Sequence, residues 1–119
     1  MTLLFVYGTL LRGEPNHALL AGAGRFVRDA RTEPAYTLWD LGPYPALTLG
    51  GATAIEGELW DVDAFDDLDA YEGESYARVL VTLEGGERVQ AYALLHAAER
   101  GSARQLEGAW RKRVASRRT

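Results

Sequence analysis

Glu72 lies at the end of a short acidic segment whose apolar residues have helical spacing. Phe65, Leu68 and Glu72 fall at i, i+3 and i+7, on one helical face, while the neighbouring aspartates point toward water. A carboxylate on an inward-facing surface is costly unless it is paired, hydrogen-bonded or protonated. Glu72 is therefore a candidate general acid/base with a raised pKa. The alternative is a glutamate that reaches past the rim of the core or pairs with Arg78.

The residues around Glu72 contain start and stop signals for this helix. Asp63 can serve as the N-cap, and Asp66 three residues later resembles a capping box. Gly73 is well placed to end the helix in a left-handed conformation, which leaves about two to three turns. Asp61, Asp63 and Glu72 also match three ligand positions of a calcium-binding loop. We reject a calcium site because Asp66 stands where that loop requires glycine.

A second candidate site follows the first apolar run directly. Tyr7 ends the apolar run of residues 2–7 and Gly8, Thr9 and Leu10 follow it, and a glycine at this junction lets the backbone turn and present successive N–H groups. Such groups bind an anion, for instance a carboxylate. The spacing of a phosphate-binding loop is missing. A simple tight turn is the alternative.

Short β-like runs bounded by glycine and proline dominate the rest of the chain. They predict strands at residues 2–7, 24–31, 36–41, 47–49, 55–62, 78–83 and 88–95, with a hairpin turn at 84–87 and a short helix after Asn16. The first run is apolar throughout, which is typical of a strand buried on both faces. We expect an α+β fold, a small mixed β-barrel with short flanking helices; an open sheet packed by one helix is the alternative.

Length and composition indicate one domain. The chain has 119 residues, enough for one hydrophobic core, and we assign residues 1–110 to a single domain. There is no cysteine, so a thiolate metal site is excluded; His17 and His96 are the only histidines, so we do not expect a histidine-rich metal site. We expect no metal and no cofactor.

The basic residues are concentrated near the C-terminus. Residues 100–119 hold seven basic residues and one acid, whereas the first 99 residues hold six basic residues and sixteen acids. A basic tail can bind nucleic acid. Because this one is short and follows an acidic body, we expect a solvated or self-neutralising tail, poorly ordered over residues 111–119, and no nucleic-acid partner.

The apolar start of the chain is too short for a signal sequence and lacks a basic leader, and no run is long enough to span a bilayer. We expect a cytoplasmic protein without membrane contact. The sequence does not indicate an oligomeric state.

Five segments in order along the chain resemble motifs of the gamma-glutamylcyclotransferase-like family, which includes gamma-glutamylamine cyclotransferases and AIG2-like proteins. They are Phe5-Val6-Tyr7-Gly8-Thr9-Leu10, Tyr44-Pro45-Ala46-Leu47, Glu56-Gly57-Glu58-Leu59-Trp60, Leu68-Asp69-Ala70-Tyr71-Glu72-Gly73 and Gly108-Ala109-Trp110. In the last of them Ala109 departs from the family's Gly-Asp-Trp. The match covers nearly the whole chain.

The resemblance implies a β-barrel with the active site at its mouth and a lactam-forming reaction. The α-amino nitrogen of a γ-glutamyl group attacks its own γ-carbonyl, 5-oxoproline forms, and an amine leaves. Glu72 matches the family's catalytic glutamate, and the backbone of residues 7–10 would hold the glutamyl carboxylate or carbonyl. The resemblance calls for a small γ-glutamyl substrate and for neither metal nor nucleotide. A non-catalytic module binding an amino-acid-like ligand in the same pocket is the alternative.

Some residues keep two interpretations. Tyr76 and Tyr92 match aromatic positions near the family's pocket, although a core residue with a satisfied hydroxyl is the commoner role of a tyrosine. The leaving amine is not identified by the sequence. The aromatic residues that could line its side of the pocket, each equally a core candidate, are Tyr36, Trp39, Tyr44 and Trp60.

Overall fold

A computed structural model describes residues 2–41, 45–94, 104–106 and 108–109 as two β-sheets and two short helices. The elements in chain order are β1 (Thr2–Val6), α1 (His17–Ala21), β2 (Gly24–Arg31), β3 (Tyr36–Asp40), β4 (Pro45–Leu49), β5 (Glu56–Val62), α2 (Asp66–Glu72), β6 (Tyr76–Thr82), β7 (Arg88–Leu94) and β8 (Arg104–Leu106). The seven strands expected from the sequence are confirmed, with ends shifted by one or two residues. Strand β8 was not predicted, and residues 111–119 of the expected tail lie outside the described residues.

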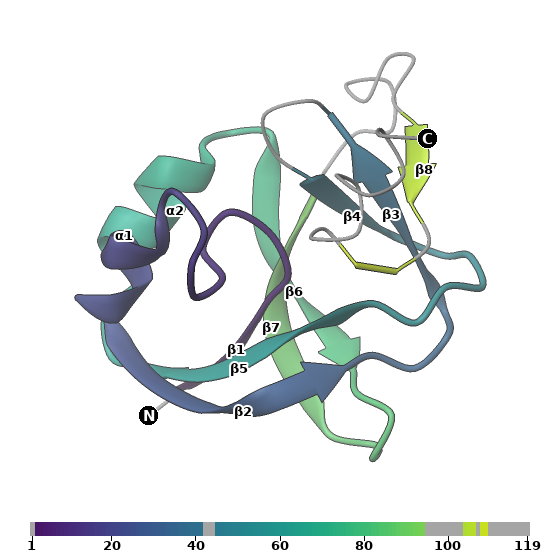
Figure 1. Cartoon of the computed structure of the whole chain (residues 1–119), viewed down its shortest axis with the longest axis horizontal. Coiled ribbons are helices and arrows are strands. Elements are labelled where there is room, and N and C mark those ends of the chain that lie inside the picture. The colour runs from purple at the N-terminus through teal and green to yellow at the C-terminus, as the bar shows by residue number, and fades with distance from the viewer. Residues whose placement is uncertain (1, 42–44, 95–103, 107, 110–119) are drawn as a thin grey trace.

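Strand β1 is the centre of the larger sheet, whose order is β2-β5-β1-β7-β6. It pairs with β7 in parallel and with β5 in antiparallel register, and the remaining neighbours are antiparallel. A second sheet of order β4-β3-β8 lies beside it (Figure 1). The chain therefore leaves β1 from the middle of the fold, which places the following loop next to both sheets.

The two faces of β1 are buried in two different clusters. Phe5 packs toward the smaller sheet with the inward residues of β5, β6 and β7. Leu4 and Val6 pack on the other face with Leu20 of α1 and Leu68 of α2. Figure 1 shows both helices on this second side. Burial on both faces explains why the first run of the sequence is apolar throughout rather than alternating.

The expected barrel is wrong, because the larger sheet does not close. Its edge strands β2 and β6 approach each other at one end, where Thr32 and Leu83 form an isolated bridge. Beyond that bridge no ladder joins the two edges within the described residues. A barrel requires continuous pairing around the whole circumference. The smaller sheet covers the inner face instead, so the architecture is an α+β fold with an open sheet.

The hairpin turn at residues 84–87 is confirmed. The N–H of Gly86 donates to the carbonyl of Leu83, and β6 and β7 pair from Thr82 and Arg88 onward. Gly86 has φ of 94°, a conformation that glycine adopts without strain.

Helix α2 begins later than the sequence predicts. Asp63 is not its N-cap: its N–H donates to the carbonyl of Ala23, so pairing beside β5 continues past the strand and delays the helix to Asp66. Phe65 occupies the N-cap position without a side-chain cap. Gly73 ends the helix at φ 78° and ψ −170°, which is not the left-handed helical conformation expected but is an extended one open essentially to glycine alone.

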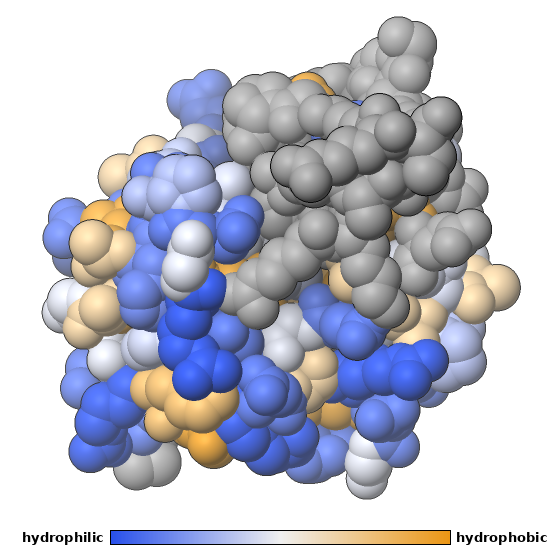
Figure 2. All heavy atoms as spheres, in the orientation of Figure 1, coloured by the Kyte–Doolittle hydropathy of each residue, from blue (hydrophilic) through white to orange (hydrophobic). Residues whose placement is uncertain are grey.

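The surface is mixed in character. Figure 2 shows polar and charged side chains over much of the described part of this face, with smaller hydrophobic areas between them. Within the described ranges, neither helix has the length or the apolar character needed to cross a bilayer.

Candidate active site

A cavity of about 190 Å³ lies where the end of β1, the last turn of α2 and the start of β4 meet. The residues lining it are Phe5, Val6, Tyr7, Gly8, Thr9, Leu10, Pro45, Tyr71, Glu72, Ser75, Tyr76 and Tyr92. The seven residues expected from the sequence to form a site are all among them. The fold thus brings together segments that are separated by more than sixty residues in the chain.

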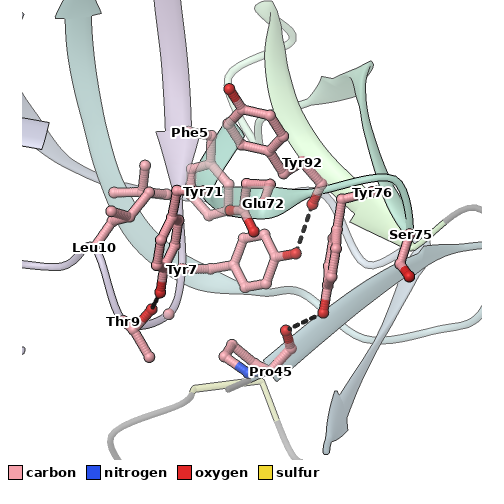
Figure 3. A pocket seen from close by; sticks show the side chains of 12 residues that line it. Phe5, Tyr7, Thr9, Leu10, Pro45, Tyr71, Glu72, Ser75, Tyr76 and Tyr92 are labelled. Atoms are coloured by element: carbon pink, nitrogen blue, oxygen red, sulfur yellow. Dashed lines mark hydrogen bonds between the residues drawn. The ribbon is translucent and has the colours of Figure 1, made fainter. Parts of the chain in front are cut away.

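Glu72 projects from the last turn of α2 into the cavity, between Tyr71 and Tyr76 and close to the ring of Tyr7 (Figure 3). Its carboxylate has no hydrogen bond or ion pair with the residues that the structure describes. Arg78, the alternative partner, binds Asp69 instead, at 3.1 Å between Nε and Oδ1. Burial raises the pKa of Glu72 from its ordinary 4.5 to about 7. A group with this pKa both accepts and releases protons near neutral pH.

The loop after β1 lines the same cavity as Glu72. The carbonyls of Gly8 and Thr9 accept hydrogen bonds from Leu11 and Asn16 within the loop. The N–H groups of Gly8, Thr9 and Leu10 have no hydrogen-bond acceptor among the described residues. Successive unpaired N–H groups in a turn form a concave site for an anion or a carbonyl oxygen.

Gly8 is required where this loop touches the second sheet. A Cβ atom at position 8 would lie 2.4 Å from Cγ of Pro45, the first residue of β4. This distance is far inside van der Waals contact, so the loop and β4 meet only because residue 8 has no side chain. The contact closes one end of the cavity.

The hydroxyl of Tyr7 is structural. It donates to the carbonyl of Tyr92 at 2.5 Å and accepts from the N–H of Leu47 at 3.1 Å, which ties β1, β7 and β4 together. Burial, and then the nearby charge of Glu72, raises the pKa of Tyr7 well above its ordinary value. Its ring faces the cavity while its hydroxyl is fully committed.

Tyr76 and Tyr92 also give the cavity their rings. The hydroxyl of Tyr76 donates to the carbonyl of Pro45 at 3.0 Å, and the hydroxyl of Tyr92 donates to Oδ1 of Asp69 at 2.6 Å. Burial and the Asp69 carboxylate raise the pKa of Tyr92. Figure 3 shows the Tyr92 hydroxyl directed away from the cavity. Both interpretations of these residues therefore hold: they line the pocket, and their hydroxyls are satisfied elsewhere.

Comparison with known proteins gives this geometry a family. The family model described as "Gamma-glutamyl cyclotransferase, AIG2-like" matches residues 4–112. The chain belongs to this family. A Vibrio cholerae protein named for gamma-glutamylcyclotransferase activity is 44% identical over 61 residues, or 51% of each chain. The human gamma-glutamylaminecyclotransferase is 39% identical over 71 residues, covering 53% of this chain and 46% of the human one. The chain thus spans about half the length of these curated relatives.

The family fold extends to solved structures. The crystal structure of a uropathogenic E. coli-specific protein matches with a TM-score of 0.85 and 28% identity over 96% of this chain and 95% of that one. Membership in the gamma-glutamylcyclotransferase family agrees with a pocket lined by both a carboxylate and the loop after β1.

A second glutamate, Glu58, holds the loop between β1 and α1 in place. Glu58 of β5 accepts hydrogen bonds from the backbone N–H of Arg12 at 3.2 Å, from Arg12 Nε at 3.0 Å and from Trp60 Nε1 at 3.2 Å. Burial opposes ionisation of Glu58, but the bonds from Arg12 and Trp60 outweigh it and lower the pKa. His17 adds a bond from Nδ1 to the carbonyl of Leu10 at 3.0 Å. The loop is thereby fixed at both ends.

The sequence missed several lining residues and proposed others that lie elsewhere. Tyr71 and Ser75 line the cavity beside Glu72, and their position next to it in the chain was an available signal. Pro45 reaches the cavity only through contact between the sheets, which no local pattern indicates. Three of the residues suggested for the leaving-group wall do not line the cavity: Tyr36, Trp39 and Trp60. The fourth, Tyr44, lies outside the described residues.

Within the described ranges, no group of three or more acidic or histidine side chains is placed to hold a metal ion.

Proposed function

We propose that this pocket binds the glutamyl part of a γ-glutamyl amine or peptide and that Glu72 catalyses its conversion to 5-oxoproline and a free amine. The observation that carries the proposal is a carboxylate with a pKa of about 7 and no partner among the described residues, in a cavity also lined by a loop with unpaired backbone N–H groups. The family membership and the names of the relatives support it.

The proposed reaction is an intramolecular acyl transfer. The α-amino nitrogen forms a bond to the γ-carbonyl carbon, and the bond from that carbon to the leaving nitrogen breaks. Ionised Glu72 takes a proton from the α-amino group and then delivers it to the departing amine, so that no net proton is gained or lost. The N–H groups of Gly8, Thr9 and Leu10 hold the glutamyl carboxylate or the carbonyl oxygen. Holding the folded-back conformer contributes strongly, because ring closure needs no second reactant.

The size of the cavity fits the cyclised half of such a substrate. A cavity of about 150 Å³ accommodates benzene, and this one is about 190 Å³. It therefore has room for a five-membered lactam with its carboxylate and little more. The leaving amine must then extend out of the cavity toward solvent, where the partly exposed lining residues Ser75 and Tyr76 could contact it. A pocket of this kind selects the glutamyl group closely and the amine loosely.

A substrate screen tests the proposal. Incubation with γ-glutamyl amines, γ-glutamyl dipeptides and glutathione should release 5-oxoproline, detected by mass spectrometry. Glu72→Gln should lower kcat by about 10²–10⁴, because it removes the proton carrier without changing shape. Glu74→Gln, two residues away on an exposed position, is the matched control and should keep wild-type activity.

Two results would contradict the proposed function. Full activity in Glu72→Gln would exclude the acid/base role. Calorimetric binding of γ-glutamyl compounds with no lactam formed from any of them would instead favour a binding module in the same pocket.

A further inference from the structure

A chain of side-chain hydrogen bonds connects the rim of the cavity to a residue outside it. Asn16 Nδ2 donates to the hydroxyl of Tyr71 at 2.8 Å, and that hydroxyl lies 2.6 Å from Oγ1 of Thr9. Thr9 and Tyr71 line the cavity, and Thr9 is buried, whereas Asn16 is not part of the lining. Figure 3 shows the link between Tyr71 and Thr9. The three residues come from the loop after β1, the last turn of α2 and the entry to α1.

The chemistry of the three groups determines which of them donates and which accepts in each hydrogen bond. An amide nitrogen donates and cannot accept, so the Tyr71 oxygen accepts from Asn16. A phenol is a stronger acid than an alcohol, and an accepted hydrogen bond polarises its O–H further, which favours donation from Tyr71 to Thr9. The oxygen of Thr9 is then occupied as an acceptor while its own hydrogen remains available. Thr9 makes no other side-chain hydrogen bond with the described residues, and its side chain borders the cavity.

We propose that Asn16 and Tyr71 are positioning residues that orient the hydroxyl hydrogen of Thr9 into the cavity, where it donates to a carboxylate or carbonyl oxygen of the ligand. The inference rests on the proposed function for the identity of the ligand. The Thr9 hydroxyl would then add a side-chain donor to the backbone N–H groups of the loop. Helix α2 would supply both Glu72 and Tyr71, the residue that orients this donor.

Asn16→Asp is the decisive substitution because it keeps the shape of the side chain and reverses the donor and acceptor roles in these hydrogen bonds. A carboxylate only accepts, so Tyr71 would donate to Asp, Thr9 would donate to Tyr71, and the hydrogen would leave the cavity. Thr9→Val removes the donor directly, and Thr9→Ser retains it. The probe is 5-oxoproline, whose Kd is measured by calorimetry, together with KM and kcat for the best substrate of the screen.

The expected result is a loss of binding with most of kcat retained. Loss of one hydrogen bond to a charged group should raise Kd and KM about tenfold to a hundredfold in Thr9→Val and in Asn16→Asp. Thr9→Ser should recover most of the binding. The double variant should bind no more weakly than Thr9→Val alone, because both changes remove the same donor.

Other outcomes would overturn the inference. Suppose that Asn16→Asp weakens binding equally in the wild-type and the Thr9→Val backgrounds. The added charge would then act on the ligand directly, and the hydrogen bonds through Tyr71 and Thr9 would not carry the effect. Wild-type affinity in Thr9→Val would exclude the donor. These results leave the proposed function intact as long as the wild-type protein forms 5-oxoproline. Binding of 5-oxoproline that follows the expected pattern without turnover would instead support the donor and contradict the catalysis. A wild-type protein that neither binds nor forms 5-oxoproline would contradict both.

Discussion

Glu58 and Glu72 both have carboxylates shielded from bulk water, but their pKa values are shifted in opposite directions. Glu58 accepts three hydrogen bonds from Arg12 and Trp60, and its pKa is lowered. Glu72 has no partner among the described residues, and its pKa is raised to about 7. Burial is common to both, so it does not by itself produce an acid/base group. The supply of donors decides whether a buried carboxylate becomes an anchor or a proton carrier.

The largest difference should appear in the pH dependence of the reaction. Because the proposed mechanism requires the base form of Glu72, whose pKa is about 7, kcat/KM should fall tenfold for each pH unit well below 7, or about fiftyfold between pH 7 and pH 5. Glu58 stays ionised over this range and should add no limb of its own. Initial rates of 5-oxoproline formation in constant-ionic-strength buffers provide the measurement. A flat profile between pH 5 and 7 would remove Glu72 from the role of base.

The next difference concerns stability, and its sign follows from the direction of the shift. The folded protein holds the proton of Glu72 up to about pH 7, while the unfolded chain releases it near 4.5. Stability is therefore lost as pH rises through this window, by up to about 3 kcal/mol. Glu72→Gln should then unfold at higher urea concentration than wild type at pH 8 and at a similar one at pH 4. Equal midpoints at pH 8 would show that Glu72 is ionised without cost.

Glu58→Gln should have the opposite and smaller effect. It removes a charged acceptor from Arg12 and Trp60, so the free energy of unfolding should fall by about 2 kcal/mol at pH 7. Because the pKa of Glu58 is lowered by folding, the wild-type advantage should itself disappear as pH falls below about 4.5. Urea unfolding followed by tryptophan fluorescence measures both quantities.

The matched control for Glu58 is a second acid on the same arginine. Asp29 pairs with Arg12 at 3.2 Å, but its side chain is 80% exposed. Asp29→Asn should change the unfolding free energy by less than about 0.5 kcal/mol. An equal loss in the two variants would mean that Arg12 is held by charge alone and not by the buried geometry of Glu58.

The sequence predicted the part of the site that local patterns define. Helical spacing indicated that Glu72 faces inward, and the glycine after an apolar run indicated an exposed-backbone loop; both line the cavity. The strand predicted at residues 55–62 was also correct, and Leu59 and Trp60 on it pack in opposite clusters. What it could not predict depends on contacts between distant strands. Closure of the barrel was wrong because the edges of a sheet meet or stay apart according to the curvature of the whole sheet.

The role of Glu58 was beyond the reach of periodicity. The sequence placed Glu58 in a strand, but its partner Arg12 is 46 residues away. The start of α2 was misplaced for a similar reason, because the N–H of Asp63 is used by Ala23, forty residues earlier. Local signals such as an N-cap predict a boundary only while tertiary pairing leaves the backbone free to follow them.

Because Gly8 lies against Pro45, the two parts of the pocket should differ in how well they tolerate substitution. Any side chain at position 8 would wedge the two sheets apart. A substitution there would disturb the contact between the loop after β1 and the start of β4. Ser75, on the rim and only partly buried, carries no such constraint. Under the proposed function, substitutions that the fold tolerates would therefore change the amine side of the pocket more readily than the glutamyl side.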